Sequence, residues 1–174
     1  KIILYGAQNP QSTRKGWKIF IETLKKIDKS KYYILIFGSF WSHKILDELE
    51  IEYNSIGFID DKEKLNLIYS CSDFFITTSI QEAFGKTWAE AMACKIPVIC
   101  FKNTASAEII EHKKHGYVVE DFSSDELKKA IEWMSNENEI KKIDSDKIRQ
   151  KAQNFDSNKI ALEYIELYSR ILKK

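Results

Sequence analysis

Several hallmarks of other protein classes are absent from this sequence. No apolar run reaches the ~20 residues that a membrane-spanning helix needs. There is no internal repeat, low-complexity tract, Walker loop or GxGxxG, and the missing GxGxxG argues against a nicotinamide dehydrogenase. A large charge of one sign is also absent, since 27 Lys and Arg face 26 Asp and Glu. A broad nucleic-acid surface needs a basic face and a high pI, so we expect no nucleic-acid partner. The balanced total charge does not exclude a local basic patch.

Cysteine is scarce as well. Cys71, Cys94 and Cys100 are an odd number without a close-spaced pair, which predicts small buried hydrophobic residues in a reducing compartment rather than disulfides. The chain opens directly on a strand-like run, residues 2–5, with neither a signal peptide nor an initiator Met. We therefore expect a cytoplasmic location and a piece of a longer protein.

What the sequence does contain is a regular alternation of apolar, strand-like runs with runs of helical periodicity. This predicts an α/β fold, a Rossmann-like parallel sheet with helices on both faces, in a single domain over residues 1–174. Strands are expected at residues 2–5, 32–37, 53–58, 74–79, 98–101 and 117–119. Helices are expected at 16–27, 46–50, 65–70, 86–94 and 107–111, and from 124 onward, including one over 140–153.

The stretch from residue 80 to 101 carries the most chemistry. Gly85 has no Cβ and so lets the backbone approach a ligand closely. The first amides of the helix that follows have no partner within it and suit a phosphate. Glu82 and Glu90 flank this anion site, and because like charges repel they are better suited to accept hydrogen bonds from sugar hydroxyls. The local pattern therefore predicts a nucleotide-sugar pocket that both carboxylates face.

The run Glu82-Ala-Phe-Gly-Lys-Thr-Trp-Ala-Glu90 resembles the E-x7-E signature of retaining GT-B glycosyltransferases of family four, the glycosyl transferases group 1. Four more elements occur in the family's order: Arg14-Lys15-Gly16, Ile56-Gly57-Phe58-Ile59 with Cys71-Ser72-Asp73, Pro97-Val98-Ile99 and Ala107-Glu108-Ile109-Ile110. The resemblance covers nearly the whole chain.

The resemblance implies the C-terminal, donor-binding half of a two-domain enzyme that transfers a hexosyl group from a nucleotide-sugar to a glycan or lipid-linked acceptor, with retention, in surface-polysaccharide biosynthesis. The implied partners are a nucleoside-diphosphate sugar and a missing N-terminal acceptor domain. Peripheral membrane association through that missing half stays open. No metal and no cofactor are expected, because cations and a helix dipole would stabilise the departing diphosphate.

Each candidate site residue has an expected role. Glu82 would hold hydroxyls of the donor sugar near the reacting carbon, and Glu90 would accept from the ribose. Lys15 would be the diphosphate cation. The remaining candidates would line the diphosphate (Phe84, Gly85, Lys86 and Thr87) or the base (the Ile59 backbone and the Lys64 side chain). Many family members carry an Arg where this sequence has Ala7, and whether Arg14 replaces it is left open.

Alternatives remain. Glu82 could act as the nucleophile of a double displacement, although its place beside the phosphate-binding amides favours hydroxyl contacts. Lys64 could equally be a solvated lysine at the start of a helix. Asp60 or Asp61 would then cap that helix without a functional role. The whole chain could instead be a non-catalytic sugar-nucleotide-binding module or part of a GT-B-like epimerase.

Other motifs have structural explanations. His112 and His115 precede a glycine at a helix end, which favours capping chemistry over a metal site. Asp144-Ser145-Asp146 is interpreted as a helix start, and Trp17 as a core residue rather than a platform for a base. The apolar stripe of the last helix is expected to be only partly covered, since in GT-B enzymes this helix crosses back toward the other domain.

Overall fold

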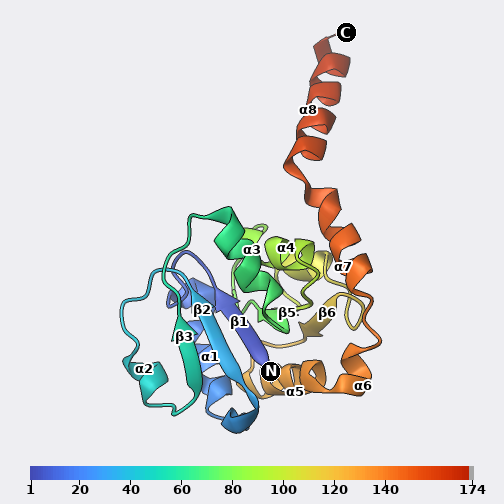
Figure 1. Cartoon of the computed structure of the whole chain (residues 1–174). Helices are drawn as coiled ribbons and strands as arrows, with labels where there is room; N and C mark the ends of the chain where they lie inside the picture. Colours follow the sequence, from blue (N-terminus) through green and yellow to red (C-terminus); the bar gives the residue numbers. More distant parts are fainter. Residues whose placement is uncertain (173–174) are drawn as a thin grey trace.

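The computed structural model describes residues 1–172 and shows one six-stranded sheet in which every neighbouring pair is parallel (Figure 1). The strands are β1 (Ile2–Gly6), β2 (Tyr33–Phe37), β3 (Glu52–Ser55), β4 (Phe74–Ile76), β5 (Val98–Phe101) and β6 (Gly116–Val119). Their order in the sheet is β3-β2-β1-β4-β5-β6. The order reverses between β1 and β4, so the chain continues from these two strands to helices on opposite faces of the sheet. Open α/β sheets bind their ligands at the carboxyl edge of such a position.

Helices cover both faces of the sheet, which confirms the predicted Rossmann-like fold. The α-helices are α1 (Trp17–Leu24), α2 (Lys44–Asp47), α3 (Lys62–Ser70), α4 (Lys86–Ala93), α5 (Ser124–Ser135), α6 (Glu137–Ile140), α7 (Ser145–Ala152) and α8 (Ser157–Leu172). Within residues 1–172 the 3-10 helices are η1 (Thr13–Lys15), η2 (Lys29–Lys31), η3 (Ala105–Glu108) and η4 (Gln153–Phe155). Side chains of α1, α2 and α5 pack on one face, and those of α3, α4 and α7 on the other.

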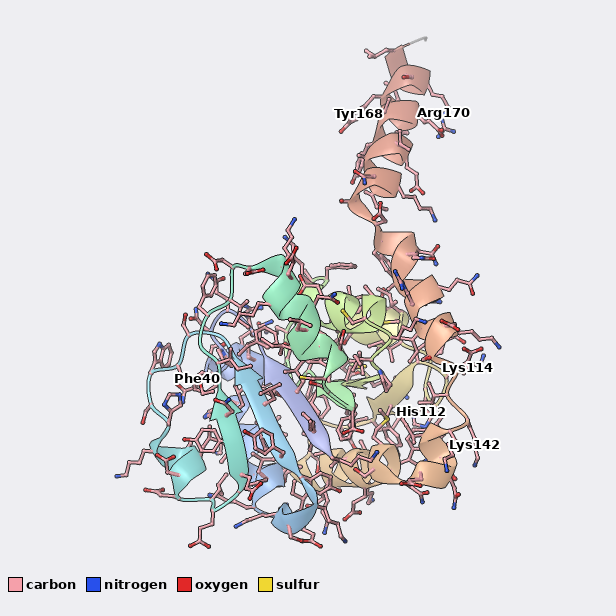
Figure 2. All side chains as sticks on the ribbon, in the orientation of Figure 1. Phe40, His112, Lys114, Lys142, Tyr168 and Arg170 are labelled. Carbon is pink, nitrogen blue, oxygen red and sulfur yellow. The ribbon has the colours of Figure 1, made fainter. Side chains whose placement is uncertain are left out.

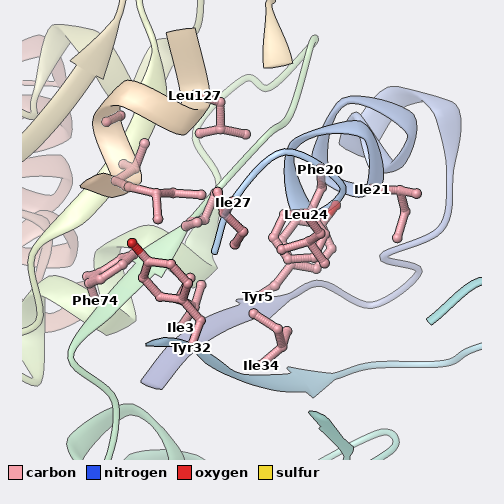
Figure 3. Close-up of a cluster of buried hydrophobic side chains, with 14 of the residues drawn as sticks. Ile3, Tyr5, Phe20, Ile21, Leu24, Ile27, Tyr32, Ile34, Phe74 and Leu127 are labelled. Carbon is pink, nitrogen blue, oxygen red and sulfur yellow. The ribbon is translucent and has the colours of Figure 1, made fainter. Parts of the chain in front are cut away.

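The strands are hydrophobic on both sides because both faces are covered. In β1, Ile3 and Tyr5 enter the core beneath α1 and α5, while Leu4 enters the opposite one. Figure 3 shows the first of these cores, with Phe20 and Leu24 of α1 against Tyr5. The half-buried Trp17 packs on Tyr5, Phe20 and Phe40, so its interpretation as a core residue is confirmed.

Several predicted boundaries were wrong, each for a local reason. The third strand ends at Ser55 because Gly57 turns the chain away in the left-handed region (φ 82°). The fourth ends at Ile76, and the polar residues after it turn their side chains inward. The helix expected at 107–111 is instead the 3-10 helix η3. The helix expected over 140–153 is interrupted, and α7 begins at residue 145 under the cap of Asp144.

Caps predicted from single residues behave as expected, with one exception. The Asp61 carboxylate accepts from the amides of Glu63 and Lys64 at the start of α3. Ser123 and Glu126 have the sequence spacing of a capping box. Ser123 does cap α5, but the Glu126 carboxylate pairs with Lys129 and does not complete the box.

The three cysteines are not uniformly buried. Cys100 is buried, Cys94 is half-buried and Cys71 is exposed at the end of α3, so the expectation of buried hydrophobic cysteines is wrong for Cys71. Burial raises the pKa of the Cys100 thiol to about 12, which keeps it protonated and unreactive near neutral pH.

The last helix, α8, projects away from the body of the molecule (Figures 1 and 2), and none of its described residues is buried. Its exposed apolar side chains are Leu162, Tyr164, Ile165, Leu167, Tyr168, Ile171 and Leu172. Nothing within residues 1–172 covers this face. No helix in that same stretch combines the length and apolar character needed to cross a bilayer.

Candidate functional site

The loops that follow β1 and β4 meet at the carboxyl edge and bring Lys15 into contact with Glu82. The Lys15 Nζ donates to Glu82 Oε2, and both side chains are largely buried, at 16% and 13% exposed. Arg14 lies farther out, with Nη1 3.8 Å from the other carboxylate oxygen and 3.3 Å from the carbonyl of Gln81. Both cations and the carboxylate were predicted as site residues, but only the fold shows that they share one ion-pair cluster.

Lys15 is held in place through its backbone. Its carbonyl accepts from the Thr78 hydroxyl at 2.6 Å and from the Tyr5 hydroxyl at 3.1 Å. The next residue, Gly16, is left-handed (φ 67°), and a Cβ there would lie 2.0 Å from the Thr78 carbonyl oxygen. Burial raises the pKa of Tyr5, so its hydroxyl stays a neutral donor. The first loop is therefore fixed against the end of β4 by contacts that allow no side chain at residue 16.

Two hydroxyl residues at this site were missed by the sequence interpretation. The apolar pattern predicts Thr78 and Ser79 as part of a strand, but they are buried polar residues in the loop that follows it. The Ser79 hydroxyl donates to Glu82 Oε2 at 3.3 Å, so the carboxylate is oriented by both a lysine and a serine. The available signal was the polar run Thr77-Thr78-Ser79, which is unusual at the end of an otherwise buried strand.

The turn before α4 leaves no room for a side chain at residue 85. Gly85 is left-handed (φ 81°), and an added Cβ would lie 2.6 Å from Trp88 Nε1 and 2.9 Å from Glu82 Cγ. The Trp88 indole donates to the Phe84 carbonyl and closes the turn. No side chain caps the start of α4, so its first amides and the dipole face outward beside Lys15 and Glu82.

The remaining residues of this turn point in different directions. The Phe84 ring packs on Trp88 and Phe155, with ring centroids 5.0 and 5.3 Å away, and Phe84 lines the same open groove as Glu90. Thr87 and Lys15 line a small cavity of about 10 Å³, the size of one water.

Glu90 lies in a different hollow from this cavity, contrary to the expectation that both carboxylates face one pocket. It lines an open groove of about 670 Å³ together with Lys62, Lys86 and Arg149. Its Oε2 accepts from the Tyr69 hydroxyl at 3.1 Å, and burial, followed by the charge of Glu90, raises the pKa of that phenol. The first turn of α4 separates the two hollows, with Thr87 on one side and Lys86 on the other.

The two residues expected near a base follow β3. Ile59 is half-buried against the core beneath α3, and Lys64 is exposed in the first turn of that helix. Lys62 of the same turn does reach the groove that contains Glu90. The histidines of the 112–115 segment use their Nδ1 atoms to accept from the amides of Val118 and Glu111. Within residues 1–172 no cluster of three metal-ligating side chains occurs.

Comparison with known proteins places this geometry in a family. The family model for glycosyl transferases group 1 matches residues 3–155. A glycosyltransferase of Rickettsia africae is 26% identical, with a TM-score of 0.84 over 99% of this chain and 48% of that one. An Anabaena protein solved with UDP and glucose is 22% identical, with a TM-score of 0.80 over 97% of this chain and 48% of that one.

A third structure is the C-terminal domain of a group 1 glycosyl transferase protein from Francisella tularensis, 24% identical, with a TM-score of 0.72 over 88% of this chain and 85% of that domain. Curated relatives are longer, and this chain spans 33% of one and 48% of another. The chain belongs to the glycosyl transferases group 1 family, as a C-terminal GT-B domain.

Proposed function

We propose that this chain is the donor-binding half of a retaining glycosyltransferase that moves a hexosyl group from a nucleoside-diphosphate sugar to a glycan or lipid-linked acceptor. The observation that carries the proposal is the contact between Lys15 and Glu82 where the sheet order reverses, beside the uncapped start of α4. The Anabaena neighbour, which shares the fold and was solved with UDP and glucose, supports a nucleotide-sugar as ligand.

Diphosphate binding would begin at the amides of Gly85, Lys86 and Thr87. These donors and the helix dipole favour an anion, and Lys15 adds a positive charge a short distance away. In the described structure Lys15 is paired with Glu82. A bound diphosphate would replace Glu82 as the partner of the Lys15 ammonium group. The Glu82 carboxylate could then accept hydrogen bonds from sugar hydroxyls.

The transfer of Lys15 from Glu82 to the diphosphate would also contribute to catalysis. Charge builds up on the departing diphosphate in the transition state, and Lys15 together with the α4 amides would stabilise it, with Arg14 as a second cation at the rim. No metal is needed for this step, because the cations and the dipole supply the positive potential. Ser79 keeps Glu82 in position when Lys15 changes partner.

The nucleoside would occupy the groove on the other side of the first turn of α4. Glu90 lies there with one oxygen bonded to Tyr69, which orients the carboxylate toward a ribose. Lys62 and Lys86 line the same groove and favour an anionic ligand within it. The Ile59 backbone and Lys64, at the end of the sheet beyond β3, would contact the base.

The acceptor would bind to a domain outside this chain. Similar solved chains are about twice as long, and α8 offers an uncovered apolar face for such a domain to pack against. We propose a cytoplasmic enzyme of surface-polysaccharide biosynthesis, with any peripheral membrane attachment provided by the missing domain.

Nucleotide titrations test the assignment of roles. UDP, GDP and ADP would each be titrated into the chain, and one base is expected to bind more tightly than the others. Glu90→Gln should then weaken that nucleotide by about tenfold, because a neutral amide oxygen accepts a ribose hydrogen bond less strongly than a carboxylate does. Glu82→Gln should leave nucleotide affinity nearly unchanged but, in the two-domain protein, reduce transfer severely.

Glu22→Gln, on the far face at α1, is the matched charge control and should change neither property. Unchanged affinity in Glu90→Gln together with unchanged turnover in Glu82→Gln would refute the proposed roles.

A further inference from the structure

A basic groove of about 620 Å³ lies outside the proposed donor site, between the segment 111–115 and the α6–α7 region. Its charged lining residues are Lys113, Lys114, Lys142, Lys147, Lys151, Glu111 and Asp144. Five lysines against two carboxylates give the groove a net charge of +3, whereas the whole chain carries +1. Positive charge is therefore concentrated here while the rest of the molecule is slightly acidic. Figure 2 shows Lys114 and Lys142 along this side of the molecule.

The groove and the donor site are separated by the fold. Segment 111–115 precedes β6, so it lies at the amino edge of the parallel sheet, opposite the loops that carry Lys15 and Glu82. Helix α7 divides the groove from the one that contains Glu90. Arg149 lines the Glu90 groove, whereas Lys147 and Lys151 line the basic one from the other side of the helix. An anion in the basic groove would not compete directly with a nucleotide-sugar.

The lysines that line the groove come from both of its walls. Lys147 and Lys151 lie four residues apart on one helix face, a spacing at which like charges repel. Two carboxylates offset part of this repulsion. Glu111 binds Lys114 at 2.8 Å and Lys151 at 3.3 Å, and Asp144 lies 3.9 Å from Lys147. Lys142 in turn pairs with Glu139 at 2.9 Å. Glu111 is shared between two lysines and Asp144 is distant, so a further anion between the walls would find Lys113 without an ion pair within residues 1–172 and Lys147 and Lys151 only partly neutralised.

Lys113 is the most distinctive of these cations. Its backbone is left-handed (φ 63°), a conformation that is unfavourable for a residue with a side chain. Its amide closes the turn by donating to the Gly116 carbonyl at 2.7 Å. Its Nζ lies 5.6 Å from the centre of the Trp133 ring, and it forms no ion pair with a carboxylate of the described residues. The turn and the ring thus hold a cation in a fixed place without neutralising it.

The histidines nearby do not add to this charge. Desolvation lowers the pKa values of His112 and His115, and both rings accept backbone hydrogen bonds through Nδ1. Both therefore remain neutral near pH 7, and the positive potential of the groove comes from lysines alone. Lysine is a point charge that suits phosphate oxygens in many orientations.

We propose that this groove binds a ligand with clustered phosphate groups, at a site separate from the nucleotide-sugar. Walls on two sides fit a compact group that enters between them, such as a soluble polyphosphate or the phosphorylated headgroup of a lipid. The two sources share one chemistry and differ in whether a bilayer is present.

Isothermal titration with tripolyphosphate tests the soluble ligand, and co-sedimentation with phosphatidylcholine vesicles, with and without phosphatidylglycerol, tests the headgroup. The double variant Lys113→Gln/Lys147→Gln should lower the affinity for whichever probe binds by about tenfold or more, because two nearby positive charges are lost. The control double variant Lys18→Gln/Lys44→Gln also removes two positive charges, from exposed lysines of α1 and α2 on the sheet face opposite α7. It should bind the probe as the unmodified chain does.

Two further measurements separate the sites. Lys15→Gln should leave binding in the groove unchanged; if it abolishes tripolyphosphate binding while the groove variant does not, the anion binds at the donor site and the proposal is wrong. Binding should also change the fluorescence of Trp133, seen as a signal lost in Trp133→Phe, because the ring lies beneath Lys113. The proposal would be overturned if neither probe binds, or if both double variants weaken binding equally.

Discussion

At the scale of single residues, the candidate site depends on how closely two loops approach each other. Gly16 lets the first loop pass against the Thr78 carbonyl, and Gly85 leaves room for Glu82 and Trp88 in the second. Both glycines also have positive φ, a backbone conformation that residues with a Cβ rarely adopt. Each position therefore requires glycine both for its backbone conformation and for lack of space. The Lys15–Glu82 contact is the result, since Lys15 directly precedes Gly16 and Glu82 lies three residues before Gly85.

Gly85→Ala should show how much of the site depends on this space. The left-handed backbone costs about 1–2 kcal/mol for alanine, and the new Cβ would also have to displace Trp88 and Glu82. We expect the free energy of unfolding to fall by about 2–3 kcal/mol and nucleotide affinity to fall with it. Urea denaturation and nucleotide titration would measure the two effects.

Gly57→Ala is the matched control, because Gly57 has nearly the same backbone (φ 82°) and no atom within 4 Å of the added Cβ. It should cost only the backbone contribution, about 1 kcal/mol, and leave affinity unchanged. Equal destabilisation by the two substitutions would show that the crowding at Gly85 is unimportant.

At the scale of elements, α4 connects the core to the site. Trp88, Ala91 and Met92 bury one side of the helix against the sheet, while its first turn carries the unpaired amides and Thr87. The helix cannot shift without exposing these side chains, so the amides are held rigidly. Helix α7 packs along α4 and in turn separates the Glu90 groove from the basic groove.

Trp88→Phe tests whether the turn before α4 is fixed by the indole. The substitution removes the donor to the Phe84 carbonyl and leaves a small cavity in the core, which we expect to cost about 2–4 kcal/mol and to weaken nucleotide binding. Thermal denaturation and titration would measure both. Trp41→Phe is the control, since Trp41 is 76% exposed, and it should change the melting temperature little.

At the scale of the whole molecule, the sheet core and α8 are different kinds of structure. The core is closed on both faces, whereas α8 presents seven exposed large hydrophobic side chains. Contiguous apolar surface of this kind usually marks an interaction site. The length of similar proteins is consistent with a second domain as the partner.

Deletion of residues 157–174 should therefore leave the stability of this chain and its nucleotide affinity nearly unchanged, because α8 buries no residue against the core. In the two-domain protein the same deletion should loosen the association of the halves and lower its melting temperature by several degrees. Calorimetry of both lengths would measure this. A large loss of stability in the short chain would show that α8 is part of this domain's core.

The elements that sequence predicts well are those whose signal is local. Alternating apolar runs and helical periodicity predicted all six strands and the helices on both faces, because burial on both sides of a parallel sheet requires continuous hydrophobic strands. Asp144 was predicted as a cap, and Asp61 as one of two candidates beside Asp60, because such carboxylates act on amides two or three residues away. The misplaced ends, such as Ser55 and Ile76, occur where a turn and not hydrophobicity decides where pairing stops.

The fold class, the family and the identity of the charged residues around the glycine turn can be predicted from the sequence, since these depend on residue types and short spacings. The folded chain is needed to show that Lys15 pairs with Glu82, that Ser79 joins them, that Glu90 faces a separate groove and that five lysines line one basic groove. These contacts join segments far apart in the chain, and their geometry is set by the strand order and by the packing of α4 and α7.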